Sequence, residues 1–166
     1  MLNTTDTINI KITKEITAIV KKSSYFEENF LHTKKLDYTN FFTNKMLMIA
    51  VINEGVPYSL FSLIQYITPF TNEHWASFLD LSTKSLLRYK QTAKNFRPLQ
   101  SEKIIEIAEV TNLGIDVFSN KEKFNTWLTT PNYALGNSTP ITLLKHSYGK
   151  ELVIAELTNI NYGIFA

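Results

Sequence analysis

The chain has 166 residues, 44% of them hydrophobic, and carries a net charge of +2. This length suffices for one substantial domain or two small ones, and so small a net charge does not by itself indicate nucleic-acid binding. The absence of cysteine excludes disulfides, thiolate metal sites and a cysteine nucleophile. The N-terminal residues lack the pattern of a signal peptide, and the longest apolar run is too short to cross a bilayer. We therefore expect a soluble, cytoplasmic protein that does not bind membranes.

Residues 1–40 give the weakest pattern in the chain. Ile8, Ile10 and Ile12 alternate with polar residues, as in a short strand or an extended arm, whereas residues 14–22 fit a helix. The polar and aromatic residues that follow show no clear period. We interpret residues 1–40 as an N-terminal arm that packs on the rest of the protein or on a partner.

Residues 41–118 are predicted to form a helical domain. A helical pattern ends at Gly55, which suits the turn after a helix, and Ser59 is a candidate N-cap for the next helix. Residues 99–118 are expected to form a long helix that connects the two halves of the chain. Glycine and proline are scarce, as in helical proteins, and the predicted fold class is all-α.

Residues 71–91 have the pattern of a helix-turn-helix unit. Such a unit needs a small residue where the helices cross, apolar residues around the turn and two apolar anchors on the second helix. These demands are met in order by Ala76, Leu79, Leu81, Leu86 and Tyr89. Thr71 or Asn72 can cap the first helix and Ser82 the second. Asp80 occupies the turn position where glycine is usual, and aspartate tolerates a left-handed backbone.

Basic residues concentrate on the second helix and the segment after it. Five basic and no acidic side chains lie between residues 84 and 97. Outward-facing Lys and Arg can contact guanine or phosphate, and Gln can read adenine. The candidate DNA-binding residues are Thr83, Lys84, Ser85, Arg88, Lys90, Gln91, Lys94 and Arg97. The alternative is a helix hairpin whose basic face is only solvated.

Residues 119–166 are predicted to form a small helical domain. Ser119 and Glu122 fit a capping box, and Thr139 can cap a helix that begins at Pro140. Gly149 suits the turn that ends this helix. A second helix carries an apolar stripe at helical spacing, formed by Val153, Leu157, Ile160 and Ile164. We expect Ile164 to close the core of this domain.

The order of residues in this C-terminal region resembles the toxin-binding domain of the Xre/ParS/MbcA-like type II antitoxins. The matching residues are Trp127, Leu128, Pro131, Asn132, Ala134, Leu135, Gly136, Pro140, Leu143, Leu144, Gly149, Val153, Leu157, Ile160 and Gly163. Residues 52–57 and 82–88 similarly resemble the helix-turn-helix half of these antitoxins. So many positions in one order are a specific signal.

The resemblance implies an antitoxin paired with a RES-domain toxin of the NAD-depleting, ADP-ribosyltransferase-like kind. Such an antitoxin covers the active site of the toxin and represses its own operon as a homodimer on operator DNA. The candidate toxin-binding residues are Asn132, Leu135, Gly136, Lys150, Asn161, Tyr162 and Phe165. The alternative is a stand-alone helix-turn-helix transcriptional regulator whose C-terminal half is only a dimerisation unit.

The sequence offers no pattern typical of an enzyme. His32, His74 and His146 lie in three separate segments, and none has a second ligand at metal-binding spacing. The five glycines are dispersed, so no phosphate-binding loop is present, and no nucleophile-elbow motif occurs. We expect no enzymatic activity, no metal and no cofactor.

Overall fold

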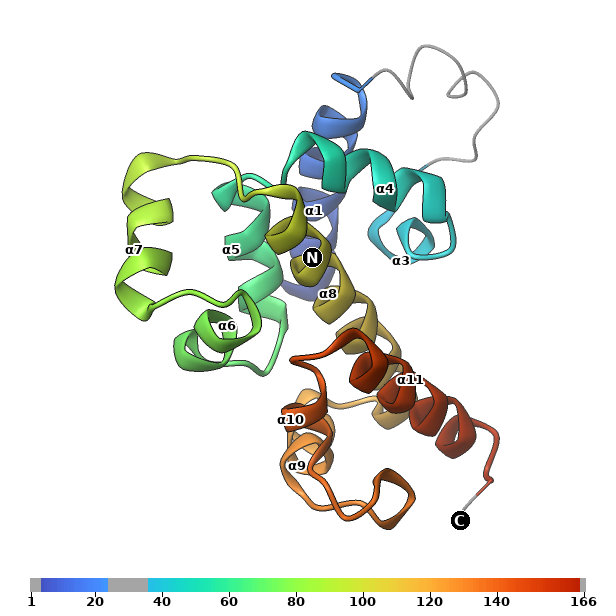
Figure 1. The fold of residues 1–166 in the computed structure, drawn as a ribbon. Helices are drawn as coiled ribbons and strands as arrows, with labels where there is room; N and C mark the ends of the chain where they lie inside the picture. The colour runs from blue at the N-terminus through green and yellow to red at the C-terminus, as the bar shows by residue number, and fades with distance from the viewer. Residues whose placement is uncertain (1–3, 24–35, 165–166) are drawn as a thin grey trace. The chain divides into compact units, whose positions relative to one another are not determined.

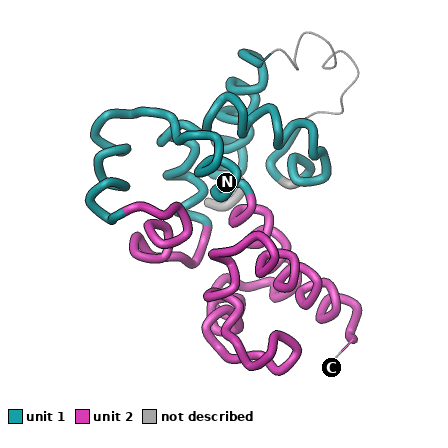
Figure 2. The backbone as a smooth tube through the Cα atoms, viewed as in Figure 1, with its two compact units in different colours: residues 1–67, 82–105 teal, residues 68–81, 106–166 magenta. Residues whose placement is uncertain are grey.

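The computed structural model describes residues 4–23 and 36–164 (Figure 1). These residues form helices and one 3-10 turn without a strand, which confirms the predicted all-α fold class. The chain divides into two compact units, each made of two stretches (Figure 2). Unit 1 contains residues 1–67 and 82–105, and unit 2 contains residues 68–81 and 106–166. No helix within the described ranges has the length and apolar character needed to span a membrane.

The strand-like or extended conformation expected for Ile8, Ile10 and Ile12 is wrong, because helix α1 spans Thr4–Val20, which includes most of the helix predicted at residues 14–22. One face of α1 is buried at helical spacing by Ile12, Ile16, Ile19 and Val20. Ile10, the middle residue of the strand-like alternation, is exposed. The alternation covers three residues only, whereas the helical stripe continues to the end of α1. Residues 24–35, which belong to the predicted arm, lie outside the described residues.

Helix α1 packs against α3 (Tyr38–Phe41), α4 (Lys45–Glu54) and α5 (Tyr58–Ile67) within unit 1. A new helix begins after Asn44, whose side chain accepts a hydrogen bond from the Leu47 amide at 3.1 Å. Gly55 ends α4 with a φ of 82°, as predicted. Ser59 does not cap α5; it lies inside the helix, and its hydroxyl donates to Glu15 of α1 at 2.7 Å.

Next to Gly55, hydrogen bonds join two segments of unit 1 that are far apart in the sequence. The Phe96 amide donates to the Val56 carbonyl at 2.8 Å, and the Val56 amide donates to the buried Ser101 hydroxyl at 2.9 Å. The same hydroxyl donates to the Phe96 carbonyl at 3.1 Å. A Cβ atom on Gly55 would lie 2.7 Å from that carbonyl oxygen, so glycine allows the close approach. These bonds fix the segment that precedes α8 (Pro98–Phe118).

Both helices predicted for the helix-turn-helix unit are present. Helix α6 (Asn72–Phe78) in unit 2 is capped by Thr71, whose hydroxyl accepts from the His74 amide at 3.3 Å. Helix α7 (Thr83–Thr92) in unit 1 is capped by Ser82, whose hydroxyl accepts from the Ser85 amide at 3.0 Å. Asp80 adopts the predicted left-handed backbone with a φ of 52°. The predicted anchors Ala76, Leu79 and Leu86 are buried.

The rest of unit 2 is built on the second half of α8. Gly114 lies against α9 (Lys121–Thr129), and a Cβ atom at this position would approach the Phe124 ring to 2.2 Å. The predicted capping box at Ser119 is wrong, because Asn120 caps α9 and accepts from the Lys123 amide at 2.9 Å. Ser119 instead has a φ of 52°, which places it in the turn before the helix.

Candidate partner-binding and nucleic-acid-binding sites

The C-terminal helices α10 (Pro140–Leu143) and α11 (Ser147–Asn161) pack closely in unit 2. Pro140 is the first residue of α10, as predicted, but the Thr139 side chain makes no capping hydrogen bond. Gly149 does not end α10; it is buried in the first turn of α11. A Cβ atom on Gly149 would lie 2.0 Å from the Leu143 carbonyl oxygen. The glycine therefore allows one helix to contact the backbone of the other.

Helix α11 has two faces of different character. Gly149, Val153 and Leu157 are buried on the inner face. The outer face carries exposed residues separated by four, three, four and three positions: Tyr148, Leu152, Ala155, Asn159 and Tyr162. We call these five residues the outer stripe. Tyr148 is 84% exposed, Leu152 54% and Tyr162 75%. Tyr162 was among the predicted contact residues, whereas Tyr148 and Leu152 were not, although their i, i+4 spacing is present in the sequence.

The end of α11 is a Schellman turn centred on Gly163, which has a φ of 70°. The Gly163 amide donates to the Ile160 carbonyl at 3.0 Å, and the Ile164 amide donates to the Asn159 carbonyl at 2.9 Å. This turn takes Ile164 off the helix, and the side chain is 60% exposed. The expectation that Ile164 closes the core is therefore wrong. Asn161 is exposed beside it, and Phe165 lies outside the described residues.

The loop from Asn132 to Ser138 is held by its own hydrogen bonds. The Asn132 side chain accepts from the Ala134 amide at 2.8 Å, and its amide nitrogen donates to Glu156 of α11 at 3.4 Å. Leu135 is buried in the 3-10 turn η2 (Tyr133–Leu135), and Gly136 is exposed with a φ of 64°. Tyr133 is the large exposed side chain of this loop. Asn132 and Leu135 thus maintain the shape of the loop and leave little of their own surface for a partner.

Lys150 is engaged inside unit 2. Its Nζ atom lies 2.7 Å from Oε2 of Glu109 on α8, and the two side chains are only 17% and 15% exposed. This ion pair joins the first turn of α11 to α8. The Lys150 ammonium group is thus already paired within unit 2, and a toxin contact by this residue stays a prediction.

The second helix of the predicted DNA-binding unit presents the expected polar face. Thr83, Lys84, Leu87, Arg88 and Gln91 are all exposed on α7. Lys90, Lys94 and Arg97 are exposed as well. Ser85 is different, because it is half-buried and its hydroxyl accepts from the Ser82 hydroxyl at 2.9 Å.

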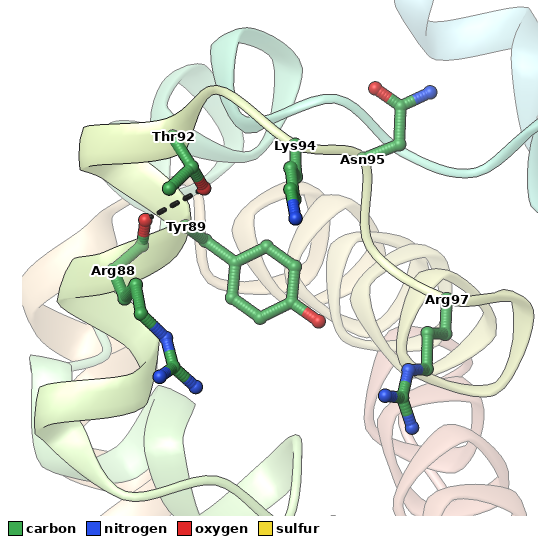
Figure 3. A pocket seen from close by; sticks show the side chains of 6 residues that line it. All are labelled: Arg88, Tyr89, Thr92, Lys94, Asn95 and Arg97. Carbon is green, nitrogen blue, oxygen red and sulfur yellow. Dashed lines mark hydrogen bonds between the residues drawn. The ribbon is translucent and has the colours of Figure 1, made fainter.

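A pocket of about 470 Å³ opens in unit 1 between α7 and the segment before α8. We call it the basic pocket; it is lined by Arg88, Tyr89, Thr92, Lys94, Asn95 and Arg97. Figure 3 shows Arg88 on one side and Arg97 on the other, with Tyr89 and Lys94 between them. No acidic side chain lines the basic pocket, so its chemistry suits an anion.

Histidines and carboxylates are the possible metal ligands within the described residues. The described ranges contain no group of three or more His, Asp or Glu side chains able to hold a metal. The His74 ring accepts from the Thr71 amide at 3.3 Å and is part of the α6 capping box. His32 lies outside the described residues.

These helices define a class of protein with helix-turn-helix elements followed by a small helical C-terminal domain. Residues 113–163 match the family model described as the antitoxin Xre/MbcA/ParS C-terminal toxin-binding domain. Two curated proteins named Antitoxin Xre are similar. The one from Yersinia enterocolitica is 30% identical over 87 residues, which span 52% of this chain and 59% of that relative. The one from Photorhabdus laumondii is 26% identical over 116 residues, which span 69% of this chain and 78% of that relative.

A solved structure is similar to this chain in fold. A chain of the M. tuberculosis MbcT–MbcA toxin–antitoxin complex matches with a TM-score of 0.53 at 22% identity, over 64% of this chain and 94% of that chain. The predicted resemblance is therefore confirmed: residues 113–163 match the toxin-binding domain of the Xre/MbcA/ParS antitoxins, and the chain is similar to curated proteins named Antitoxin Xre. The relatives are named as antitoxins, a class without enzymatic activity, which agrees with the expectation that this chain is not an enzyme.

Proposed function

We propose that this chain is the antitoxin of a type II toxin–antitoxin system. It neutralises a RES-domain toxin of the NAD-depleting, ADP-ribosyltransferase-like kind by covering the active site of that toxin. It also acts as a homodimer in the cytoplasm and represses its own operon through α6 and α7. In this proposal residues 41–118 form the DNA-binding domain and residues 119–166 the toxin-binding domain.

The observation that carries the proposal is the outer stripe of α11. The inner face of the helix already packs in unit 2, yet the outer face exposes two tyrosines and a leucine. Clustered exposed aromatic and aliphatic residues are typical of protein interfaces, because they bury a large area at small entropic cost. Inhibition by coverage needs such a rigid surface and needs no catalytic group.

The outer stripe also changes the set of residues that we assign to the toxin contact. Tyr148, Leu152 and Tyr162 are the large exposed side chains of the stripe, with Ile164 contributed by the turn after α11 and Tyr133 by the neighbouring loop. Asn161 and Gly136 remain exposed candidates. Lys150, Asn132 and Leu135 support this surface from within unit 2, through the ion pair with Glu109 and the hydrogen bonds of the loop.

Operator binding is supported by the exposed polar face of α7. Lys84, Arg88 and Gln91 lie on one face of a helix whose N-cap and buried anchor are in place. A helix of this kind can enter the major groove and contact base edges. The local excess of positive charge would add affinity for the phosphate backbone.

The toxin claim is tested by co-expression with the product of the neighbouring gene, followed by a growth assay and co-purification. We expect the chain to restore growth and to form a stable complex. Tyr148→Ser with Leu152→Ser should lose both effects, whereas Met46→Ser, an exposed apolar residue of α4, should keep them. All three positions are exposed, so these substitutions should change the free energy of unfolding by no more than about 0.5 kcal/mol each.

The outer stripe also fits a second copy of the chain, which is the alternative of a stand-alone regulator. In that case the neighbouring gene product would neither be toxic nor bind, and the double variant would convert a dimer to a monomer. Size-exclusion chromatography with light scattering separates the two outcomes. Loss of toxin binding without any change in the mass of the free chain supports the antitoxin.

A further inference from the structure

We propose that the basic pocket binds a single phosphate group and that Arg88 is a phosphate ligand, not a reader of base edges. The inference rests on the proposed function only for the source of that phosphate, which would be the operator backbone. The same chemistry would also accept the phosphate of a free nucleotide.

Three positively charged side chains line the basic pocket. Arg88 reaches the basic pocket from α7, while Lys94 and Arg97 reach it from the following segment (Figure 3). None of these three side chains forms an ion pair with a residue that the structure describes. Guanidinium groups bind phosphate through paired N–H donors, and an ammonium group adds a compact positive charge. The three cations therefore line one pocket with donors that no described acidic side chain engages.

The walls of the basic pocket are held in place by ring stacking and hydrogen bonds. The Tyr89 ring stacks on the buried Phe96 ring, with centroids 4.3 Å apart and planes 12° apart. The Tyr89 hydroxyl donates to Gln100 Oε1 at 3.1 Å, and the Arg97 amide donates to the same oxygen at 3.4 Å. Gln100 thus ties α7 to the segment that carries Lys94 and Arg97. Fixed walls lower the entropic cost of holding an anion between them.

The position of Arg88 on α7 also suits a phosphate ligand. Arg88 follows Lys84 by one helical turn and belongs both to the exposed face and to the basic pocket. A phosphate held here would lie at the edge of the groove that α7 enters, where backbone contacts set the register of a helix. Base reading is then left to Lys84 and Gln91.

The test measures binding to a labelled duplex from upstream of the chain's own gene, by fluorescence anisotropy at several salt concentrations. Lys94→Gln with Arg97→Gln should reduce the slope of log K against log salt by about 1, the value for one lost phosphate contact. The matched control is Lys11→Gln with Lys14→Gln, which removes the same charge from exposed positions of α1. This control should leave the slope unchanged.

Arg88→Gln is the discriminating variant. A phosphate ligand predicts weaker binding by the same factor on the duplex and on its single-base-pair variants. A base reader predicts that one base-pair preference of roughly 5- to 150-fold disappears. If that preference disappears, or if the pocket variants behave as the α1 control while the wild type binds DNA, the inference is overturned and the proposed operator binding stands.

A second measurement identifies the source of the phosphate. AMP and inorganic phosphate are titrated into the free protein, and amide NMR signals of residues 92–97 are followed. If the wild type binds no duplex but these ligands shift the signals in the wild type and not in the Lys94→Gln, Arg97→Gln variant, a free nucleotide is the source. The basic pocket would then stand while operator binding fails. If neither the duplex nor a free phosphate ligand binds, the inference is refuted.

Discussion

Replacement of Gly149 by alanine tests the close contact between α10 and α11. An added Cβ atom would lie 2.0 Å from the Leu143 carbonyl oxygen, whereas ordinary contact begins near 3.4 Å. The two helices must therefore separate by about 1.4 Å, the difference between these distances. The obstacle is backbone, which cannot rotate away as a flexible side chain does.

Two opposing terms set the size of the effect. Alanine stabilises a helix interior by about 1 kcal/mol relative to glycine. Overpacking a well-packed site costs about 1–3 kcal/mol, and a backbone obstacle places Gly149→Ala at the upper end of that range. We therefore expect the free energy of unfolding of unit 2 to fall by about 2 kcal/mol.

Urea denaturation followed by tryptophan fluorescence measures this change, because both tryptophans of the chain, Trp75 and Trp127, belong to unit 2. The control is Ser147→Ala in the same helical turn, which is exposed and should change the free energy by no more than about 0.5 kcal/mol. A Gly149→Ala protein as stable as the wild type, or more stable, would refute the argument from close packing.

Three further experiments test the interior of the two units. Ser101→Ala leaves the Val56 amide without its hydrogen-bond partner and should destabilise unit 1 by about 1–3 kcal/mol. Hydrogen exchange at that amide should become faster, and unchanged exchange would contradict the predicted loss of stability. Tyr38→Phe removes a buried hydroxyl that lacks a hydrogen-bond partner among the described residues and whose burial raises the pKa of Tyr38. The free energy of unfolding of unit 1 should therefore rise by about 1 kcal/mol, whereas a decrease would show that the hydroxyl has a partner. Lys150→Met should lower the free energy of unfolding of unit 2 by about 2 kcal/mol, a value between those of exposed and buried ion pairs. Adding Glu109→Gln should restore part of this free energy, whereas additive effects of the two substitutions would argue against the ion pair.

The sequence was most informative where one residue type has one local use. Asp80 in the turn, Ser82 at the N-cap and Gly55 after α4 could all be assigned because caps and left-handed turns depend on nearby residues. The alternation at Ile8, Ile10 and Ile12 misled because three residues cannot distinguish a strand from a helix.

Contacts between distant segments could not be predicted in the same way. Gly149 follows a helix in sequence and so suggested a turn, but its function depends on the position of the Leu143 carbonyl in space. Ile164 continued the spacing of the core stripe, but α11 ends at Asn161 and the turn at Gly163 takes Ile164 off the helix. The ion pair of Lys150 with Glu109 could not be predicted either, because the two residues are 41 positions apart in the sequence. The basic pocket likewise depends on the three-dimensional convergence of α7 with the residues that follow it.

Hydroxyl-radical footprinting of the chain, free and in complex with the toxin from the neighbouring gene, tests the central claim most directly. Tyr148, Leu152 and Tyr162 are exposed in the free chain, and Tyr66 of unit 1 is an exposed internal reference. Coverage of the toxin by the outer stripe predicts that oxidation of the three stripe residues falls on complex formation while oxidation of Tyr66 is unchanged. A complex in which the three residues remain as reactive as in the free chain would contradict the proposal.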